Sequence, residues 1–436
     1  MKWLKYLLFN TYVCFILIFI VGCNILCLYY LNIKYILLIS VFYTVLLHMI
    51  IHLYEGYKLG TYKVSEIVYS VSLATLLCNC LTYGLIFIIN LDFKIFIYMF
   101  LLQIIQTLFT ILWGVVGNKL YFLIFEHHQI LLIFGHDPTE VSKKIISRKN
   151  RYFITRMISD SLTSKEIIEL STVYDSIMLY EVRKDLRDLI TVYCFEEEKS
   201  LFIIPEIPEI IRRGTHNLYL MDTPLLVANH WGLSLGQKIV KRVMDLLIII
   251  PVAIIVSPFM LITALCIKLY DRGPIIYKQD RLTIDGEVFQ VYKFRSMIVN
   301  AEQKGAQLST ENDNRITPIG KIIRAIRFDE LPQIINILKG DMSIVGPRPE
   351  RPEIADEYYN EFPEFKLRLK VKAGLTGYAQ VFGKYNTTPK DKLKLDLMYI
   401  NDYSLYMDLK LIIYTIKILF MKSSTEGIEE GKKTAI

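Results

Sequence analysis

Two adjacent carboxylates, Asp329 and Glu330, are the residues whose type and position best suit group-transfer chemistry. The run that follows repeats apolar residues at helical spacing, namely Leu331, Ile334, Ile335 and Leu338. We therefore predict a helix with these side chains inward, Asp329 at its N-cap and Pro332 in its first turn. Such a pair commonly caps a helix and complements its dipole. The position also suits a carboxylate that attacks phosphorus, since the dipole favours the ionised form and nearby N–H groups hold phosphate oxygens.

Basic residues surround the acidic pair in the sequence. The candidates for binding phosphate or nucleotide are Lys278, Arg281, Lys293, Arg295, Arg327 and Arg348. Arg348 stands between Pro347 and Pro349, which should keep its backbone extended and so direct its guanidinium group. A planar guanidinium suits two phosphate oxygens better than an ammonium does. One such cation alone is an ordinary surface charge, but this many around an acidic pair indicate a site for a diphosphate substrate and a lipid phosphate.

The composition indicates that these residues belong to a membrane protein. Hydrophobic residues make up 53% of the 436, and four apolar stretches open the chain, at roughly 6–31, 35–54, 67–91 and 95–116. Each stretch is near the roughly 20 residues that a membrane-crossing helix needs, so we predict a four-helix transmembrane region over 1–120. Most of its lysines fall at one face, which places the N-terminus in the cytoplasm. The net charge of +7 fits an anionic membrane surface or phosphate-rich ligands, and we expect no nucleic-acid partner.

The sequence pattern changes in a second region, 121–235. Short β-type runs alternate with helical segments, which predicts a small Rossmann-like α/β domain with a parallel sheet. Thr163 and Glu166 are spaced as a capping box that opens one of its helices. The first strand leads to a single glycine, Gly135, whereas a dinucleotide site needs several to admit the pyrophosphate. We therefore interpret this domain as regulatory or structural.

The apolar stretch at 246–267 contains no charged residue and is long enough for a fifth transmembrane helix. Pro251 and the pair Ser257-Pro258 interrupt it, and an interior proline tends to kink a helix. Both flanks are basic, which places both ends in the cytoplasm. A helix over 244–268 that enters one leaflet, bends at Ser257-Pro258 and returns satisfies both observations, and we favour it over a span. It opens a predicted catalytic domain over 236–422, followed by a polar tail at 423–436.

The chain from about 241 to 420 resembles the bacterial sugar transferase family, the monotopic phosphoglycosyl transferases. The motifs that carry the resemblance are Ser257-Pro258, YKFRSM (292–297), DELPQ (329–333), KGDMS (339–343), VGPRP (345–349), GLTGYAQ (374–380) and DLMYI (396–400). With the preceding helices and α/β domain, the chain resembles the large initiating transferases of capsule and exopolysaccharide synthesis. The resemblance implies a mixed α/β catalytic domain with a re-entrant membrane helix, on the cytoplasmic side of the bacterial inner membrane.

The resemblance also implies a two-step reaction. Asp329 would attack the sugar-linked phosphorus of a UDP-sugar, release UMP and keep the phosphosugar, which undecaprenyl (polyprenyl) phosphate would then take. Glu330 would assist as an acid/base or organise the site, and Mg²⁺, with Asp329 as its ligand, would neutralise the diphosphate. A second copy of the chain is a further candidate partner.

Two other classes of function compete with this interpretation. A catalytically silent membrane scaffold or regulator of polysaccharide assembly would keep the fold, but it needs neither the intact acidic pair nor Arg348. A transporter is a weaker alternative, since the four N-terminal stretches contain almost no charge and offer no evident polar pathway.

Overall fold

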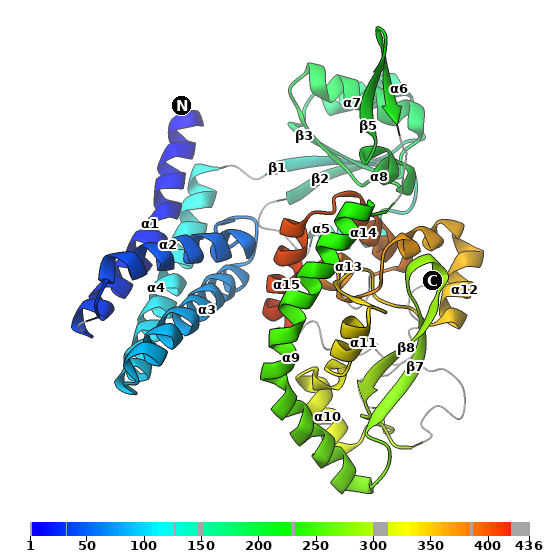
Figure 1. Cartoon of the computed structure of the whole chain (residues 1–436). Helices are drawn as coiled ribbons and strands as arrows, with labels where there is room; N and C mark the ends of the chain where they lie inside the picture. Colours follow the sequence, from blue (N-terminus) through cyan, green and yellow to red (C-terminus); the bar gives the residue numbers. More distant parts are fainter. Residues whose placement is uncertain are drawn as a thin grey trace. The chain divides into compact units, whose positions relative to one another are not determined.

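A computed structural model describes residues 2–31, 33–125, 128–146, 152–227, 232–299, 313–383 and 387–419 (Figure 1). The predicted polar tail, 423–436, lies outside the described residues. The chain divides into two compact units, Met1–Ile204 and Pro205–Ile436, each of which is described by itself.

The first unit opens with four long apolar helices. They are α1 (Lys2–Tyr30), α2 (Ile36–Leu53), α3 (Val64–Asn90) and α4 (Lys94–Ile124). Across the described part of the chain five helices are long and apolar enough to cross a membrane, these four and α9 (Leu235–Asp271) of the second unit. Their number and length identify the chain as a membrane protein.

A ring of neutral polar side chains joins three of these helices. The Tyr43 hydroxyl of α2 donates to Asn79 Oδ1 of α3 at 2.9 Å, and Asn79 Nδ2 donates to Gln106 Oε1 of α4 at 2.9 Å. Gln106 Nε2 closes the ring by donating to the Tyr43 hydroxyl at 3.2 Å. All three residues are fully buried. Such interhelical bonds hold apolar helices together, so this polarity has a structural explanation.

The rest of the first unit is an α/β module with a parallel sheet of order β2-β1-β3-β4. Its elements are β1 (His128–Phe134), α5 (Thr139–Ile146), β2 (Tyr152–Ser159), α6 (Ser164–Ser171), β3 (Ser176–Tyr180), α7 (Lys184–Glu196) and β4 (Ser200–Ile203). Helices α6 and α7 pack on one face of the sheet, through Ile167 and Ile190, while α5 packs on the other. The predicted parallel α/β region is confirmed, as is the capping box of Thr163 and Glu166 that opens α6.

The second unit combines α-helices with short sheets. It begins with α8 (Ile207–Arg213) and an exposed hairpin of β5 (His216–Leu220) and β6 (Thr223–Val227). Helix α8 is bonded to α14 within this unit, since the Ile210 carbonyl accepts from Asn401 Nδ2 at 3.2 Å. After α9 come the antiparallel hairpin of β7 (Ile276–Leu282) and β8 (Val288–Phe294), then α10 (Pro318–Ala325), η2 (Phe328–Glu330), α11 (Gln333–Lys339), β9 (Ser343–Val345), α12 (Pro352–Glu361), η3 (Pro363–Lys370), β10 (Gly374–Thr376), α13 (Tyr378–Phe382), α14 (Pro389–Asn401) and α15 (Leu405–Leu419). Strands β9 and β10 pair in parallel beneath the site.

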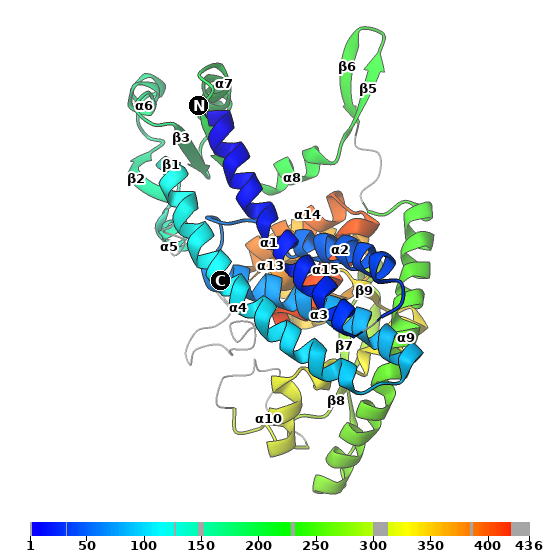
Figure 2. The same ribbon diagram turned by 90° about the vertical axis from the view of Figure 1, so that its left-hand side faces the viewer.

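Helix α9 is one continuous helix, longer than the predicted re-entrant segment at 244–268. It starts early because Ser234 and Gln237 form a capping box, which satisfies backbone donors at the helix N-terminus. Figures 1 and 2 both show the helix changing direction part way along. Pro251 and Pro258 lie in its interior, and Ser257 Oγ donates to the Ile254 carbonyl at 2.9 Å.

Both ends of α9 pack against the same unit. Near its start, Lys241 pairs with Asp408 of α15. Near its end, Ile267 packs with Phe294 of β8 and Ile323 of α10. Most of the exposed side chains between these ends are large and apolar, among them Leu247, Ile254, Ile255, Leu261 and Ile262. One side of α9 therefore packs against the rest of the unit, and the other side is an exposed apolar surface, called the bare apolar flank below.

Candidate active site

The acidic pair does not cap a helix. Asp329 and Glu330 lie in the short 3₁₀ turn η2, and α11 begins only at Gln333. The N-cap of α11 is Pro332, with no side-chain cap bond, so the prediction of Asp329 at the N-cap is wrong. The residue before η2, Arg327, adopts a left-handed backbone with φ of 55°. A non-glycine residue in that region is strained, and such strain is frequent at functional sites.

The inward face of α11 also differs from the prediction. Ile334 and Ile337 are buried, whereas Ile335 and Leu338 remain 40% and 38% exposed. The reason is Asn336, which is fully buried. Its Oδ1 accepts from the Tyr292 N–H at 3.0 Å and its Nδ2 donates to the Gln290 carbonyl at 2.7 Å. Because a buried amide needs these partners, it turns toward β8 and rotates the apolar face.

Cations hold the other end of α11. Arg242 of α9 donates to the carbonyl oxygens of Ile337 at 2.6 Å and Leu338 at 2.8 Å, and Lys372 donates to that of Gly340 at 2.5 Å. The last carbonyls of a helix lack the usual N–H donors four residues further on, and positive charge there also complements the helix dipole. The segment that carries the acidic pair is thus fixed between β8 and α9.

Glu330 is held between two cations. Its Oε1 accepts from Lys293 Nζ of β8 at 3.2 Å and from an Arg348 guanidinium nitrogen at 3.3 Å. Burial alone would raise the pKa of Glu330, but Lys293, Arg348 and Arg327 lower it well below its ordinary value. Glu330 therefore favours its ionised form and organises two cations at one place.

Asp329 has the opposite electrostatic environment. Burial raises its pKa above the ordinary value, the adjacent charge of Glu330 raises it further, and Lys293 and Arg324 only partly oppose this. The expectation that a helix dipole keeps Asp329 ionised is wrong, because α11 starts at Gln333. The pKa values of these two neighbouring carboxyl groups are displaced in opposite directions, so Asp329 and Glu330 can have different chemical roles.

The rate of a reaction that needs ionised Asp329 should depend on pH in a defined direction. The pKa of Asp329 is raised. As the pH falls, its carboxyl group therefore becomes protonated earlier, at a higher pH, than the carboxyl group of an ordinary aspartate. We expect kcat/KM to fall toward low pH along a limb set by this raised pKa. Replacing Glu330 by Gln removes one cause of the shift and should move the limb to lower pH. A limb that stays in place would contradict the assignment.

Two of the six predicted phosphate-binding cations, Lys293 and Arg348, contact Glu330. Arg348 is flanked by prolines as the sequence indicated and stays 45% exposed, so part of its guanidinium is accessible to a ligand. Arg327 contributes charge beside Glu330 and lowers the pKa of that group.

The other three cations are placed differently. Arg295 is buried and pairs with Asp271 at the end of α9. Lys278 faces Tyr292 across the hairpin, so side-chain alternation puts it on the face opposite to Lys293. Arg281 donates to the Pro349 carbonyl at 3.0 Å, and burial lowers its pKa to about 10. Their binding of phosphate stays a prediction.

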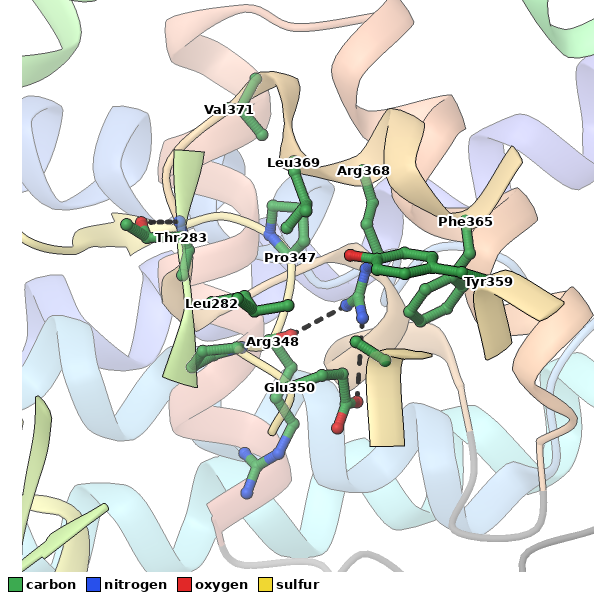
Figure 3. Close-up of a pocket in the computed structure, with 13 residues that line it drawn as sticks. Leu282, Thr283, Pro347, Arg348, Glu350, Tyr359, Phe365, Arg368, Leu369 and Val371 are labelled. Atoms are coloured by element: carbon green, nitrogen blue, oxygen red, sulfur yellow. Dashed lines mark hydrogen bonds and ion pairs between the residues drawn. The ribbon is translucent and has the colours of Figure 1, made fainter. Parts of the chain in front are cut away.

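Sequence reasoning missed two residues beneath the Arg348 loop. Arg368 and Asp396 form a buried ion pair at 2.8 Å, and Arg368 lines a pocket with Arg348 and Glu350 (Figure 3). Asp396 opens a motif that carried the family resemblance, which was a usable signal. Arg368 stands in an alternating basic run and gave none.

The described residues contain no cluster of three His, Cys, Asp or Glu side chains that could hold a metal ion by itself. Mg²⁺ commonly takes only one or two carboxylates and completes its shell with substrate phosphates and water. Glu330 is engaged with Lys293 and Arg348, whereas Asp329 accepts from its own backbone N–H. Asp329 is therefore the residue that fits such an ion, together with a diphosphate substrate.

Comparison with known proteins places this site in a family. The profile described as bacterial sugar transferase matches residues 236–422. A UDP-glucose:undecaprenyl-phosphate glucose-1-phosphate transferase of Caulobacter vibrioides is 37% identical over 184 residues, which cover 41% of this chain and 69% of that protein. The uncharacterized sugar transferase EpsL of Bacillus subtilis is 36% identical over 193 residues, covering 44% of this chain and 91% of EpsL. The chain belongs to the bacterial sugar transferase family.

A larger relative matches over the same region. The UDP-N-acetylgalactosamine-undecaprenyl-phosphate N-acetylgalactosaminephosphotransferase of Aeromonas hydrophila is 42% identical over 183 residues, which cover 41% of this chain and 43% of that protein. The chain thus spans about two fifths of the length of this relative, and its family match lies in the second unit.

Proposed function

We propose that this chain transfers a sugar 1-phosphate from a UDP-sugar to undecaprenyl (polyprenyl) phosphate, giving a polyprenyl-diphosphate-sugar and UMP. The observation that carries the proposal is Asp329, a carboxyl group free of side-chain partners among the described residues, beside Glu330 and its two cations. Relatives named for this reaction with glucose or N-acetylgalactosamine support the reaction class. The product would begin a capsular or exopolysaccharide repeat.

The reaction divides into two displacements at one phosphorus atom. In the first, an Asp329 carboxylate oxygen bonds to the sugar-linked phosphorus, the diphosphate P–O bond breaks, and UMP leaves with the electron pair. In the second, a phosphate oxygen of the lipid bonds to that phosphorus and the bond to Asp329 breaks, which restores the carboxylate. Covalent catalysis thereby separates one displacement between two anions into two steps.

The chain's own cations would stabilise both steps. Lys293 and Arg348 converge on Glu330, so each presents positive charge beside Asp329 without needing to reorganise. Glu330 would keep these two side chains in place, an organising role rather than an acid/base one, because its pKa lies well below the ordinary value. Mg²⁺ held by Asp329 and the diphosphate would neutralise phosphate charge when bound.

The acceptor is a membrane lipid, and α9 supports a position at the inner leaflet. A helix that crosses a bilayer has its ends about 30 Å apart on opposite surfaces. The contacts of Lys241 and of Ile267 with one unit support re-entry over such a crossing. Re-entry from the cytoplasmic side leaves the bare apolar flank in lipid and the site at the membrane surface.

Re-entry predicts the labelling of two exposed positions. Cysteines that replace Lys238, before the apolar part of α9, and Lys278, after it, should be equally shielded from a membrane-impermeant thiol reagent in intact cells. Both should react after permeabilisation. Labelling of only one in intact cells would establish a fifth span and refute re-entry.

Release of UMP tests the proposed function directly. Purified protein is incubated with a panel of UDP-sugars and polyprenyl phosphate, and we expect UMP and a polyprenyl-diphosphate-sugar from at least one of them. No UMP with any sugar would favour a silent scaffold. Sugar movement across vesicles without UMP would favour a transporter.

A further inference from the structure

The loop that carries Arg348 is held through four successive carbonyl oxygens. Two donors are backbone N–H groups and two are guanidinium groups. The bonds run from Gly374 N to Pro347 O (2.9 Å), Arg368 to Arg348 O (2.9 Å), Arg281 to Pro349 O (3.0 Å) and Leu282 N to Glu350 O (2.9 Å). Pro347 and Pro349 have no N–H, so carbonyl oxygens are the main groups through which this loop can be fixed.

Arg368 makes the bond to the residue that faces the acidic pair. Its side chain is 5% exposed, pairs with Asp396 of α14 at 2.8 Å and stacks over Phe365 at 4.7 Å. In Figure 3 it points at the Arg348 carbonyl, while the Arg348 side chain points the other way. A buried guanidinium whose charge is balanced by Asp396 has one fixed position, so it fixes the backbone from which Arg348 projects.

We infer that Arg368, anchored by Asp396, is a positioning residue that directs the Arg348 guanidinium toward Glu330. The inference rests on the proposed function, in which Arg348 acts beside Asp329. The distance from an Arg348 guanidinium nitrogen to Glu330 Oε1 is 3.3 Å, and the Arg348 side chain is 45% exposed. The direction of the Arg348 side chain therefore depends on the position of its backbone. Displacement of a catalytic group by about 1 Å can lower the rate by about 10²-fold.

A buried ion pair can also be merely structural, and replacing one with apolar residues is often neutral for stability. The two roles differ in their coupling to Arg348. If Arg368 acts through Arg348, its replacement should matter only while Arg348 is present. If it only stabilises the fold, its replacement should have the same effect with or without Arg348.

A double-mutant cycle tests the inference, with the steady-state rate of UMP release in the presence of polyprenyl phosphate as the readout. Arg368→Met should lower kcat/KM for the UDP-sugar by about 10- to 100-fold, and Arg348→Ala by at least as much. The double variant should be no slower than Arg348→Ala alone. Arg368→Lys keeps the charge opposite Asp396 and should be intermediate; it replaces Arg368→Met in the cycle if that variant does not fold.

Lys241→Met is the matched control, because Lys241 and Asp408 form another buried ion pair of the same unit, and Lys241 donates to Asp408 rather than to the Arg348 loop. Its effect should be the same in the presence and absence of Arg348. An Arg368 effect that is equally independent of Arg348 would overturn the inference while leaving the proposed function intact. Absence of UMP release by the unmodified protein would instead overturn the proposed function.

Discussion

Asp329→Asn is expected to abolish sugar-phosphate transfer, with a loss of kcat/KM on the order of 10⁴-fold or more, as removal of a catalytic nucleophile typically gives. An amide has nearly the size of a carboxyl group but is a very poor nucleophile toward phosphorus. Asp329 makes no side-chain cap bond in the structure, so the substitution should leave folding intact. It also removes the negative charge next to Glu330, so the variant should bind UDP-sugar at least as well when binding is measured without Mg²⁺. Steady-state UMP release and nucleotide binding measure the two effects separately.

Asp285→Asn provides the control for this change. Asp285 also lies in a 3₁₀ turn, between β7 and β8, but it is largely exposed and its pairing with Lys370 at 3.7 Å is a surface contact. Its replacement should leave turnover near that of the unmodified protein. Turnover by Asp329→Asn that matches the Asp285→Asn control would reduce the acidic pair to a structural feature.

Glu330→Gln should be the second most damaging single substitution, lowering kcat by about 10²-fold, because Lys293 and Arg348 lose the group that positions them. Gln keeps the shape and accepts hydrogen bonds, but it leaves Lys293 and Arg348 facing each other without a countercharge. The side chains of Glu330 and Lys293 are only 17% and 21% exposed. The free energy of unfolding should therefore also fall, by about 1–3 kcal/mol.

Glu353→Gln is the matched control for charge removal, since Glu353 is exposed in the first turn of α12. It should leave turnover unchanged and stability nearly so. Glu330→Gln that keeps full turnover while losing stability would show that the cations are held for folding rather than for chemistry.

Features that depend on residues near in sequence were predictable. The apolar helices and the parallel α/β region follow from hydrophobic period and length, and the capping box of Thr163 and Glu166 needs only four consecutive residues. The acidic pair could be found because its two members are adjacent and stand in a family motif. The separation of Lys278 from Lys293 depends on the register of the β7–β8 hairpin, which the sequence analysis did not predict.

Features that depend on distant partners were not predictable. The inward face of α11 was misassigned because Asn336 turns toward β8 to satisfy its amide, which no local pattern reveals. Arg295 was predicted to bind phosphate, but in the folded chain it pairs with Asp271 at the end of α9, a partner that no local pattern indicates. Arg368 acts on a carbonyl group twenty residues away and is balanced by Asp396 on a third element, so its role appears only in the folded chain.

The covalent state of Asp329 tests the central claim most directly. The protein is incubated with a UDP-sugar that supports turnover, without lipid, and its intact mass is measured, followed by peptide mapping. The account predicts release of close to one equivalent of UMP and a mass increase equal to one phosphosugar, located on Asp329 and discharged by polyprenyl phosphate. The Asp329→Asn variant should gain no mass. An adduct on another residue, or turnover with lipid but no adduct without it, would contradict the account.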